Sequence, residues 1–389
     1  MKKLLPLLFL LCFTGNALGA GNIHYGSLEI HPYLNLSEYY TDNVFATETD
    51  AEHDWVTTIT PGIKLQFPFR AHKLTLDYYA VLSRYANFDS ENTTNHNANA
   101  IADFKLGSRF GLTLSDKYER GHEARSNSAT GQVENYETNA ATLSAKYMFV
   151  DRANIRLDYT GTIWNFKQSD YRDRQEHFLA AYFYYRFLPK TSAFVEYDYN
   201  NISYSQKEFS YGQKEYGLDS AIHTGFLGLT WEASEHTKGT IKGGYMLRDF
   251  EDSNMEDMST WAVSANLAHS FSEYSFLRLI GSRVANETKY IGASSYVTTS
   301  AFADYMHKIT YKITLVMRGQ YGIDDYSNVI ESNTEERRDK TYMIGGGVKY
   351  QMRDWVEFVL DYNHWDRDSS IAGNDMKNNI YSLSINFSL

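Results

Sequence analysis

Charged side chains in this sequence recur at every second position of segments that are otherwise apolar. Within residues 356–363, Glu357 and Asp361 each have apolar residues on both sides. Because successive side chains of a strand point to opposite faces, these carboxylates share a face, and a lipid-facing charge at mid-membrane would cost about 2–4 kcal/mol. We therefore expect an inward, pore-lining wall that carries Arg156, Asp158, Glu196, Asp198, Lys242, Arg248, Lys312, Arg318, Lys349, Glu357 and Asp361.

Two interpretations of this charged wall remain open. If the charges face a solute, they set up a transverse field that favours polar, hydrated molecules and rejects apolar ones. If they pair across strands, they only stabilise the wall. The inward aromatic residues Tyr79, Trp164 and Trp365 present a similar choice, between stacking on sugar rings and lying in interfacial girdles.

No constellation in the sequence predicts catalysis, a metal site or a cofactor. The 12 histidines are scattered, and we expect them in or near loops, turns and strand ends, without the spacing of a helical zinc site. The only cysteine, Cys12, leaves no disulfide framework, thiolate metal site or covalent haem attachment. An enzyme is not expected, although an outer-membrane enzyme stays an alternative.

The N-terminal residues have the pattern of a cleaved signal peptide. Lys2 and Lys3 precede an apolar run, residues 4–13, and small residues follow at Ala17 and Gly19. The run is too short to span a bilayer as a helix, for which about 20 residues are needed. We expect residues 1–20 to be removed, which leaves residues 21–389 as one unit and lowers the formal charge from −11 to −13.

The mature segment predicts an all-β membrane protein. Aromatic residues make up 15 % of the chain and prolines number five, and no run after Phe13 approaches 18 apolar residues. At the C-terminus, residues 381–389 alternate strictly between apolar and small polar side chains. This composition and alternation favour a single transmembrane antiparallel up-and-down β-barrel in the outer membrane of a Gram-negative cell.

The spacing of turn and loop residues gives the number of strands. Short connections are expected near residues 68–72, 107–110, 150–152, 189–190, 233–237, 272–273, 308 and 353–354. Long connections are expected near residues 41–54, 88–95, 122–132, 168–172, 206–213, 252–257, 291–296, 326–338 and 369–376. Eight periplasmic turns and nine external loops predict eighteen strands, with sixteen as the alternative and both termini in the periplasm. Pro61 is expected to mark a bulge or a strand end.

A stretch near the mature N-terminus carries a family resemblance. The segment YYTDNVFATETDAEHDWVTTITPGIKLQF covers residues 39–67, and the next strand contains Leu74, Leu76, Asp77 and Tyr78. It resembles the β-barrel porins of the outer membrane that are encoded with bacterial exopolysaccharide and exosortase loci. The resemblance implies an exit pore for a secreted exopolysaccharide that works with periplasmic polysaccharide-export proteins. It carries no catalytic residues.

Other functions and partners follow from the charge and the barrel. A net negative charge argues against nucleic acid as a partner, because phosphate binding needs a basic surface. The expected partners are outer-membrane lipid, lipopolysaccharide and the barrel assembly machinery. A general or solute-selective diffusion porin and the barrel sheath of a multihaem cytochrome conduit remain alternatives to the exit pore. The long segment 324–338 is the expected constriction.

Overall fold

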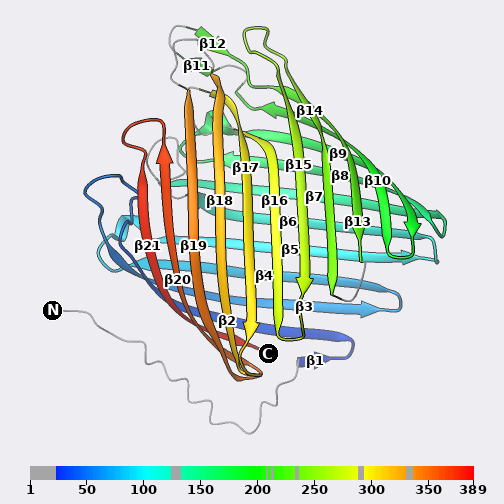
Figure 1. Cartoon of the computed structure of the whole chain (residues 1–389), viewed down its shortest axis with the longest axis horizontal. Helices are drawn as coiled ribbons and strands as arrows, with labels where there is room; N and C mark the ends of the chain where they lie inside the picture. The colour runs from blue at the N-terminus through cyan, green and yellow to red at the C-terminus, as the bar shows by residue number, and fades with distance from the viewer. Residues whose placement is uncertain are drawn as a thin grey trace.

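The chain forms a closed antiparallel β-barrel (Figure 1). The computed structural model describes residues 23–123, 133–206, 209–211, 214–232, 236–287, 293–329 and 336–389. The main sheet has 19 strands, of which the short β1 (Ile23–Tyr25) pairs only with β2, so eighteen strands close the barrel. This confirms the all-β class and the prediction of eighteen strands, and it makes the alternative of sixteen wrong.

The barrel strands follow one another around the sheet in chain order. They are β2 (Leu28–Thr41), β3 (Asp54–Phe69), β4 (His72–Tyr85), β5 (Thr93–Leu106), β6 (Phe110–Glu123), β7 (Glu134–Val150), β8 (Ala153–Phe166), β9 (Arg174–Leu188), β10 (Thr191–Tyr204), β13 (Ser220–Trp231), β14 (Thr237–Phe250), β15 (Met258–Ser270), β16 (Ser275–Glu287), β17 (Ala293–Lys308), β18 (Ile313–Val329), β19 (Arg337–Arg353), β20 (Val356–Ser369) and β21 (Met376–Ser388). A separate hairpin, β11 (Phe209–Tyr211) and β12 (Lys214–Tyr216), stands between β10 and β13. The barrel closes where β2 pairs with both β3 and β21.

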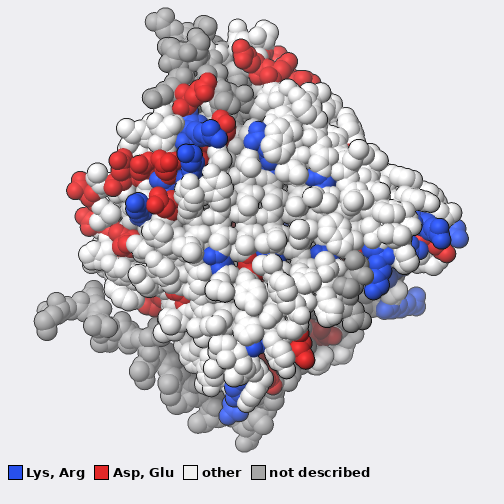
Figure 2. Space-filling model, in the orientation of Figure 1, with Lys and Arg blue, Asp and Glu red and all other residues white. Residues whose placement is uncertain are grey.

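Strand alternation separates an apolar outer face from a mixed inner face. On β19, Tyr342 and Ile344 are 46 % and 65 % exposed, whereas Met343 between them is 7 % exposed. Figure 2 shows the result as a broad, largely uncharged surface over the strands, with many of the acidic and basic side chains toward its margins. Within the described residues, no helix is long and apolar enough to cross a membrane. The apolar outer face of the strands matches the lipid-facing surface that is typical of an outer-membrane barrel.

The two ends of the barrel differ in their connections. Nine longer connections, including those after β2 and β16, leave one end, which we call the loop end; eight short turns leave the other, the turn end. The first residue of β2 and the last residue of β21 lie at the turn end, where the C-terminus is close to β1 (Figure 1). Alternating long and short connections are typical of outer-membrane barrels, in which the short turns face the periplasm.

Two local expectations need correction. Strand β3 continues through Pro61 without a bulge, and only its pairing with β4 is interrupted there, because the residue without an N–H faces that neighbour. The short connection expected near residue 308 extends further, because β18 begins at Ile313 and the residues before it form a turn. The hydroxyl of Thr310 accepts hydrogen bonds from the backbone N–H groups of Lys312 and Ile313 at 3.2 and 3.0 Å, which stabilises this turn.

A thiol-labelling experiment tests the orientation of the barrel. Ser253 lies in the connection between β14 and β15 at the loop end, and Asp354 lies in the turn between β19 and β20. We expect a Ser253→Cys variant to react with an impermeant thiol reagent on whole cells, and an Asp354→Cys variant to react only after the outer membrane is breached. Residues 21–389 contain no cysteine, so the unsubstituted chain is the control. Reversed labelling would show that the loops face the periplasm.

Candidate functional site

Ion pairs connect most of the charged residues that the sequence places on the inner wall. Arg156 lies 3.0 Å from Asp158, Lys242 lies 2.6 Å from Glu196, and Arg318 lies 2.6 Å from Asp361. Arg248 pairs with Glu287, a residue that the sequence did not single out, at 2.7 Å. Glu357 accepts a hydrogen bond from Asn386 at 3.0 Å; Asp198 and Lys349 lie on the same face of β10 and β19 as the paired charges. Lys312 does not lie on the wall, because it belongs to the turn before β18.

Glycines on intervening strands make room for some of these pairs. Arg318 is on β18 and Asp361 is on β20, and β19 lies between them. A Cβ atom on Gly347 of β19 would lie 2.5 Å from the Asp361 carboxylate, so a larger residue there would displace the ion pair. The guanidinium of Arg318 binds both carboxylate oxygens, at 2.9 and 2.6 Å. This bidentate geometry fixes the two charges against the wall.

Aromatic side chains also line the inner wall. Tyr182 and Tyr184 of β9 stack with ring centroids 5.9 Å apart, and the Arg156 guanidinium lies 3.8 Å from the Tyr182 centroid. Nearer the loop end, Trp164 and Phe166 of β8 are nearly parallel, with centroids 6.0 Å apart. Tyr79 and Trp365 are directed to the same inner face by their pairing with Gly62 and Met343. These rings give the wall flat apolar platforms beside its charges.

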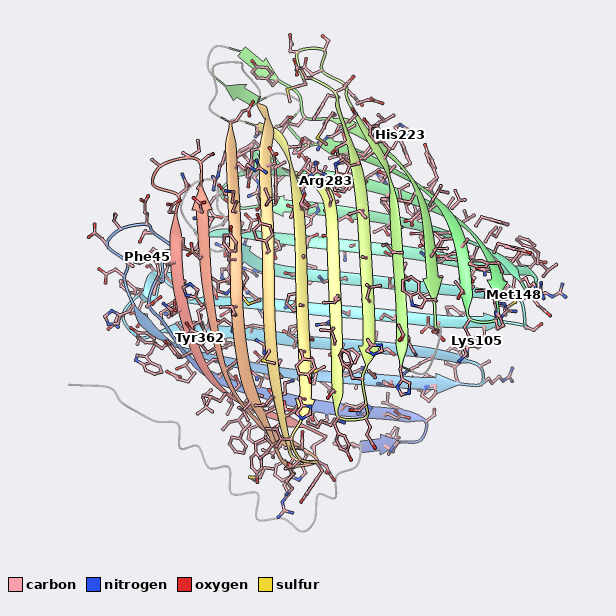
Figure 3. The ribbon with its side chains drawn as sticks, in the orientation of Figure 1. Phe45, Lys105, Met148, His223, Arg283 and Tyr362 are labelled. Carbon is pink, nitrogen blue, oxygen red and sulfur yellow. The ribbon has the colours of Figure 1, made fainter. Side chains whose placement is uncertain are left out.

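One hairpin leaves the wall and enters the barrel. Pairing between β15 and β16 ends at Val263 and Arg283, whereas pairing between β16 and β17 continues to Glu287 and Ser295. At the point of separation, the Arg283 guanidinium donates hydrogen bonds to Thr260 on β15 and Thr299 on β17 (Figure 3). Two register shifts between β17 and β18, at residues 293–297, supply the bend. We call residues 284–287 and 293–298 the mouth hairpin.

The mouth hairpin packs against the inner face of its own neighbours. Val297 and Ala285 pack with Met246 of β14 and Met258 of β15, and these apolar residues are buried or partly buried. The hydroxyl of Ser295, which is fully buried, donates to the Met258 sulfur at 3.6 Å. Met246 lies on the face opposite to the exposed side chains of Tyr245 and Leu247, so the hairpin lies inside the barrel. It therefore occupies part of the lumen at the loop end.

An ion pair ties the mouth hairpin to the wall. The Glu287 carboxylate binds Arg248 of β14 through both oxygens, at 2.7 and 3.1 Å, and accepts a hydrogen bond from the Tyr204 hydroxyl of β10. Arg248 also donates to the Ser220 hydroxyl of β13 from Nε and Nη2, at 3.1 and 2.9 Å. Arg248 and Ser220 are both 0 % exposed. Four strands thus meet at one buried ion pair.

The other side of the hairpin faces the opposite wall. Tyr296 stacks on Tyr326 of β18 with centroids 4.6 Å apart, and it is close enough to Glu123 and Arg172 to interact with them electrostatically. Arg172 binds both carboxylate oxygens of Glu123 at 3.1 Å. Because Glu123 ends β6, which lies diametrically opposite β17 in the order of strands, the hairpin narrows the mouth between two walls.

The segment expected to form the constriction, residues 324–338, is described only in part. Residues 330–335 lie outside the described residues, and Tyr326, which belongs to the expected segment, stacks on Tyr296 of the mouth hairpin. Strands β17 and β18 also extend into two of the expected loops, since β17 begins at Ala293 and β18 ends at Val329. The run of small residues Ala293, Ser294 and Ser295 is the sequence signal of this close packing, and all three are buried.

Three histidines lie near strand ends, as expected, since each is the fourth residue of its strand. The hydroxyls of Tyr78, Tyr159 and Tyr197 lie 2.9, 2.8 and 2.7 Å from Nδ1 of His96, His177 and His223, respectively. Each pair is diagonal across two strands of the outer face, in the half nearer the loop end, where amphipathic rings of a membrane barrel are typical. Within the residues described, no group of three or more metal-ligating side chains occurs.

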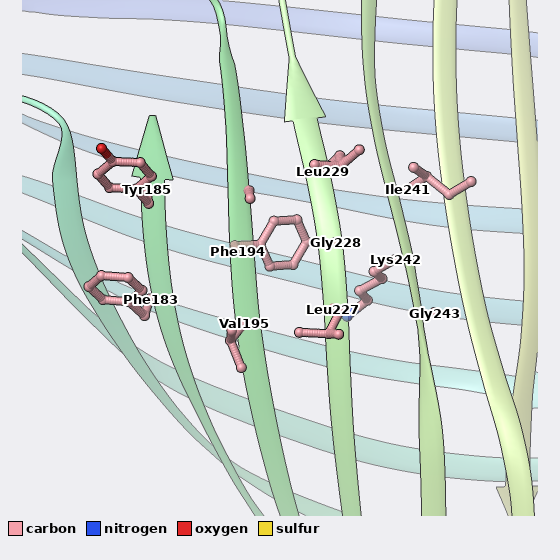
Figure 4. Close-up of a pocket in the computed structure, with 11 residues that line it drawn as sticks. Phe183, Tyr185, Phe194, Val195, Leu227, Gly228, Leu229, Ile241, Lys242 and Gly243 are labelled. Atoms are coloured by element: carbon pink, nitrogen blue, oxygen red, sulfur yellow. The ribbon is translucent and has the colours of Figure 1, made fainter. Parts of the chain in front are cut away.

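An apolar groove lies on the outer face, away from the lumen. It has a volume of about 520 Å³ and is lined mainly by side chains such as Phe183, Val195, Leu227 and Ile241 (Figure 4). Gly243 at its edge carries no side chain, which leaves the groove open. Its apolar lining fits the lipid surroundings of the barrel rather than a solute path.

Comparisons with known proteins agree with this architecture. A family model described as Putative beta-barrel porin 2 matches residues 16–389. The outer membrane protein OpdK from Pseudomonas aeruginosa has a similar structure, with a TM-score of 0.51 and 10 % sequence identity over 92 % of this chain and 99 % of that chain. OpdO from Pseudomonas aeruginosa gives a TM-score of 0.50 and 12 % identity over 93 % and 97 % of the two chains. A search of curated proteins found no match.

Proposed function

Because this chain belongs to the family described as Putative beta-barrel porin 2, we propose that it is a solute-selective diffusion channel whose mouth hairpin opens and closes the lumen. The mouth hairpin carries this proposal. Its β16 arm no longer pairs with β15 and is held to that side of the wall by a buried ion pair and a small apolar contact, whereas its β17 arm stays paired with β18. A strand end that has lost one of its two neighbours can move on the microsecond to second timescale of gating motions.

The inner wall supports transport of polar solutes. Its charges are arranged as local pairs of opposite sign, so the lumen carries a transverse field rather than a single-sign field. Such a lumen favours hydrated, polar molecules. One solved structure of similar fold, with a TM-score of 0.52 and 10 % identity, is OpdK with vanillate, which is a small solute.

A second candidate, the exit pore for an exopolysaccharide, is favoured by the aromatic platforms. The stacked pairs Tyr182–Tyr184 and Trp164–Phe166 present flat faces, on which sugar rings stack. The two functions differ in what a deletion strain loses. A diffusion channel predicts impaired uptake of small solutes with normal surface polysaccharide. An exit pore predicts intact polymer synthesis without polymer display.

Conductance in planar bilayers tests the diffusion channel. A variant in which residues 285–297 are replaced by a two-residue Asn-Gly turn lacks the mouth hairpin. We expect it to conduct roughly twice as well as the intact protein or better, because the narrowest part of the lumen has been widened. A variant shortened in the loop between β20 and β21, which lie three and four strands beyond β17 in the sheet, is the matched control. If neither the intact protein nor the variant without the mouth hairpin conducts, the proposed function is wrong.

Ion selectivity tests whether the paired charges act on permeating solutes. An Arg318→Gln variant leaves Asp361 unpaired in the lumen, and we expect its cation-to-anion permeability ratio to rise roughly twofold. The matched Asp361→Asn variant should shift the ratio the other way, and the double variant should resemble the intact protein. Reversal potentials in a salt gradient measure all three. Equal ratios in every variant would show that the pair is only structural.

A further inference from the structure

The side chains around the Glu287 carboxylate form a binding site that suits a carboxylate group. Two Arg248 nitrogens approach from one side, one on each carboxylate oxygen, and the Tyr204 hydroxyl donates to the oxygen that accepts from Nη2. The Ser220 hydroxyl orients the guanidinium by accepting from Nε and Nη2. Arg248 Nη2 donates a hydrogen bond to one oxygen, and Nη1 lies 2.7 Å from the other as an ion pair. A guanidinium that meets both oxygens, with a hydroxyl donor beside it, suits a carboxylate.

The residues that bind the carboxylate belong to the barrel wall, whereas Glu287, which carries the carboxylate, belongs to the mouth hairpin. Arg248, Ser220 and Tyr204 come from β14, β13 and β10, which stay in the wall, and Glu287 is the last residue of β16 before the hairpin loop. When the hairpin moves away, a guanidinium that is 0 % exposed loses its counter-ion. The broken pair then leaves a positive charge on the inner wall, at which an anion from the lumen can replace Glu287.

The neighbourhood restricts the anion further. The Phe250 ring centroid lies 4.6 Å from the Arg248 guanidinium carbon, and Tyr204 belongs to an apolar cluster that includes Ile202 and Leu218. Arg174 lies close enough to Glu287 to add a second positive field. A carboxylate attached to an apolar or aromatic body satisfies both the charge and this apolar surround.

We propose that Arg248, Tyr204 and Ser220 form a binding site for the carboxylate of a transported solute, and that Glu287 occupies this site when the channel is closed. This inference rests on the proposed function and names the solute class. An incoming carboxylate takes over the interactions that Glu287 gives up, which lowers the free energy of moving the hairpin. The ligand thereby favours the open state because it binds only where Glu287 has left.

Calorimetric titration of the folded protein in detergent micelles tests the site independently of transport. The probe is benzoate, and benzamide is its neutral counterpart of the same shape. We expect a Glu287→Gln variant to bind benzoate about tenfold more tightly than the intact protein, since the tethered competitor has lost its charge. Benzamide should bind neither protein measurably. A Glu232→Gln variant, which changes a carboxylate in the turn after β13, is the control and should match the intact protein.

Two further variants locate the bound benzoate. Arg248→Gln in the Glu287→Gln background should abolish binding, and Tyr204→Phe in that background should weaken it several-fold because one donor is removed. Slower migration of heated than of unheated protein on gels verifies that each barrel has folded. If the Arg248 variant does not fold, the Tyr204 variant decides.

The results separate this inference from the proposed function. Benzoate binding that depends on Tyr204 and strengthens in the Glu287→Gln variant supports the site. Equal binding of benzoate and benzamide, or no benzoate binding by the folded Glu287→Gln variant, overturns it whether or not the channel conducts. Conductance of the intact protein or of the variant without the mouth hairpin in bilayers decides the proposed function alone.

Discussion

A Met258→Cys/Ser295→Cys variant is expected to lose its conductance when a short bifunctional thiosulfonate joins the two thiols. Met258 lies on the inner face of β15 and Ser295 on the mouth hairpin, with their side chains 3.6 Å apart. A cross-link here prevents the hairpin from leaving the wall, so the channel is confined to its narrowed state. Single-channel recordings before and after cross-linking measure the effect, and dithiothreitol should restore the original conductance.

The single-cysteine variants are the controls for this experiment. Each should retain its conductance in the presence of the reagent, because a thiol on one side alone cannot restrain the hairpin. Cys12 lies in the expected signal peptide, so the mature protein adds no background reaction. Undiminished conductance in the cross-linked double variant would show that the hairpin is a fixed part of the wall and does not control the lumen.

The strands were predictable because each barrel strand has one face toward lipid and one toward the lumen, and its side chains alternate accordingly. Alternation of lipid-facing and lumen-facing residues has a period of two, and turn residues interrupt it, so eighteen strands follow from local patterns alone. The alternation also identified Arg318 and Asp361 as sharing a face. Their pairing was not predictable, since it crosses β19 and depends on the small size of Gly347.

The mouth hairpin could not be predicted from local patterns, because it forms where the pairing between β15 and β16 ends. Residues 284–287 continue to pair with β17, as the residues of a wall strand do. The loss of pairing with β15 beyond Arg283 and the register shifts between β17 and β18 direct them into the lumen, and both are properties of two strands together. Glu287 was therefore not recognised as a partner of Arg248, which is 39 residues away in the chain.

Turns and contacts on the outer face also depend on interactions that a local sequence pattern does not show. Lys312 was placed on the wall by alternation, but the Thr310 hydroxyl holds it in a turn. His96 and His177 lie near strand ends, as expected, but the tyrosine of the preceding strand beside each of them was not predicted. Diagonal neighbours of this kind depend on strand register, and register is set by the pairing of whole strands rather than by a local motif.

Replacing Ile344 with arginine is expected to destabilise the barrel in lipid by about 2–4 kcal/mol. Ile344 lies near the middle of β19, and its side chain is 65 % exposed on the outer face. In a water-soluble protein a charge at such an exposed position would cost little, whereas here the guanidinium enters the hydrocarbon core of the bilayer. Equilibrium unfolding by urea in lipid vesicles measures the difference, provided that the unfolding is reversible.

A Met352→Arg variant is the matched control for the position of the charge across the bilayer. Met352 lies on the outer face of the same strand, 40 % exposed and next to the turn end. There the guanidinium reaches the interface, and the expected cost falls to about 0–1 kcal/mol. The contrast between Ile344 and Met352 depends on the position of the bilayer, because both changes introduce the same residue on the same face. Equal destabilisation by the two substitutions would contradict a membrane that is centred on the middle of the strands.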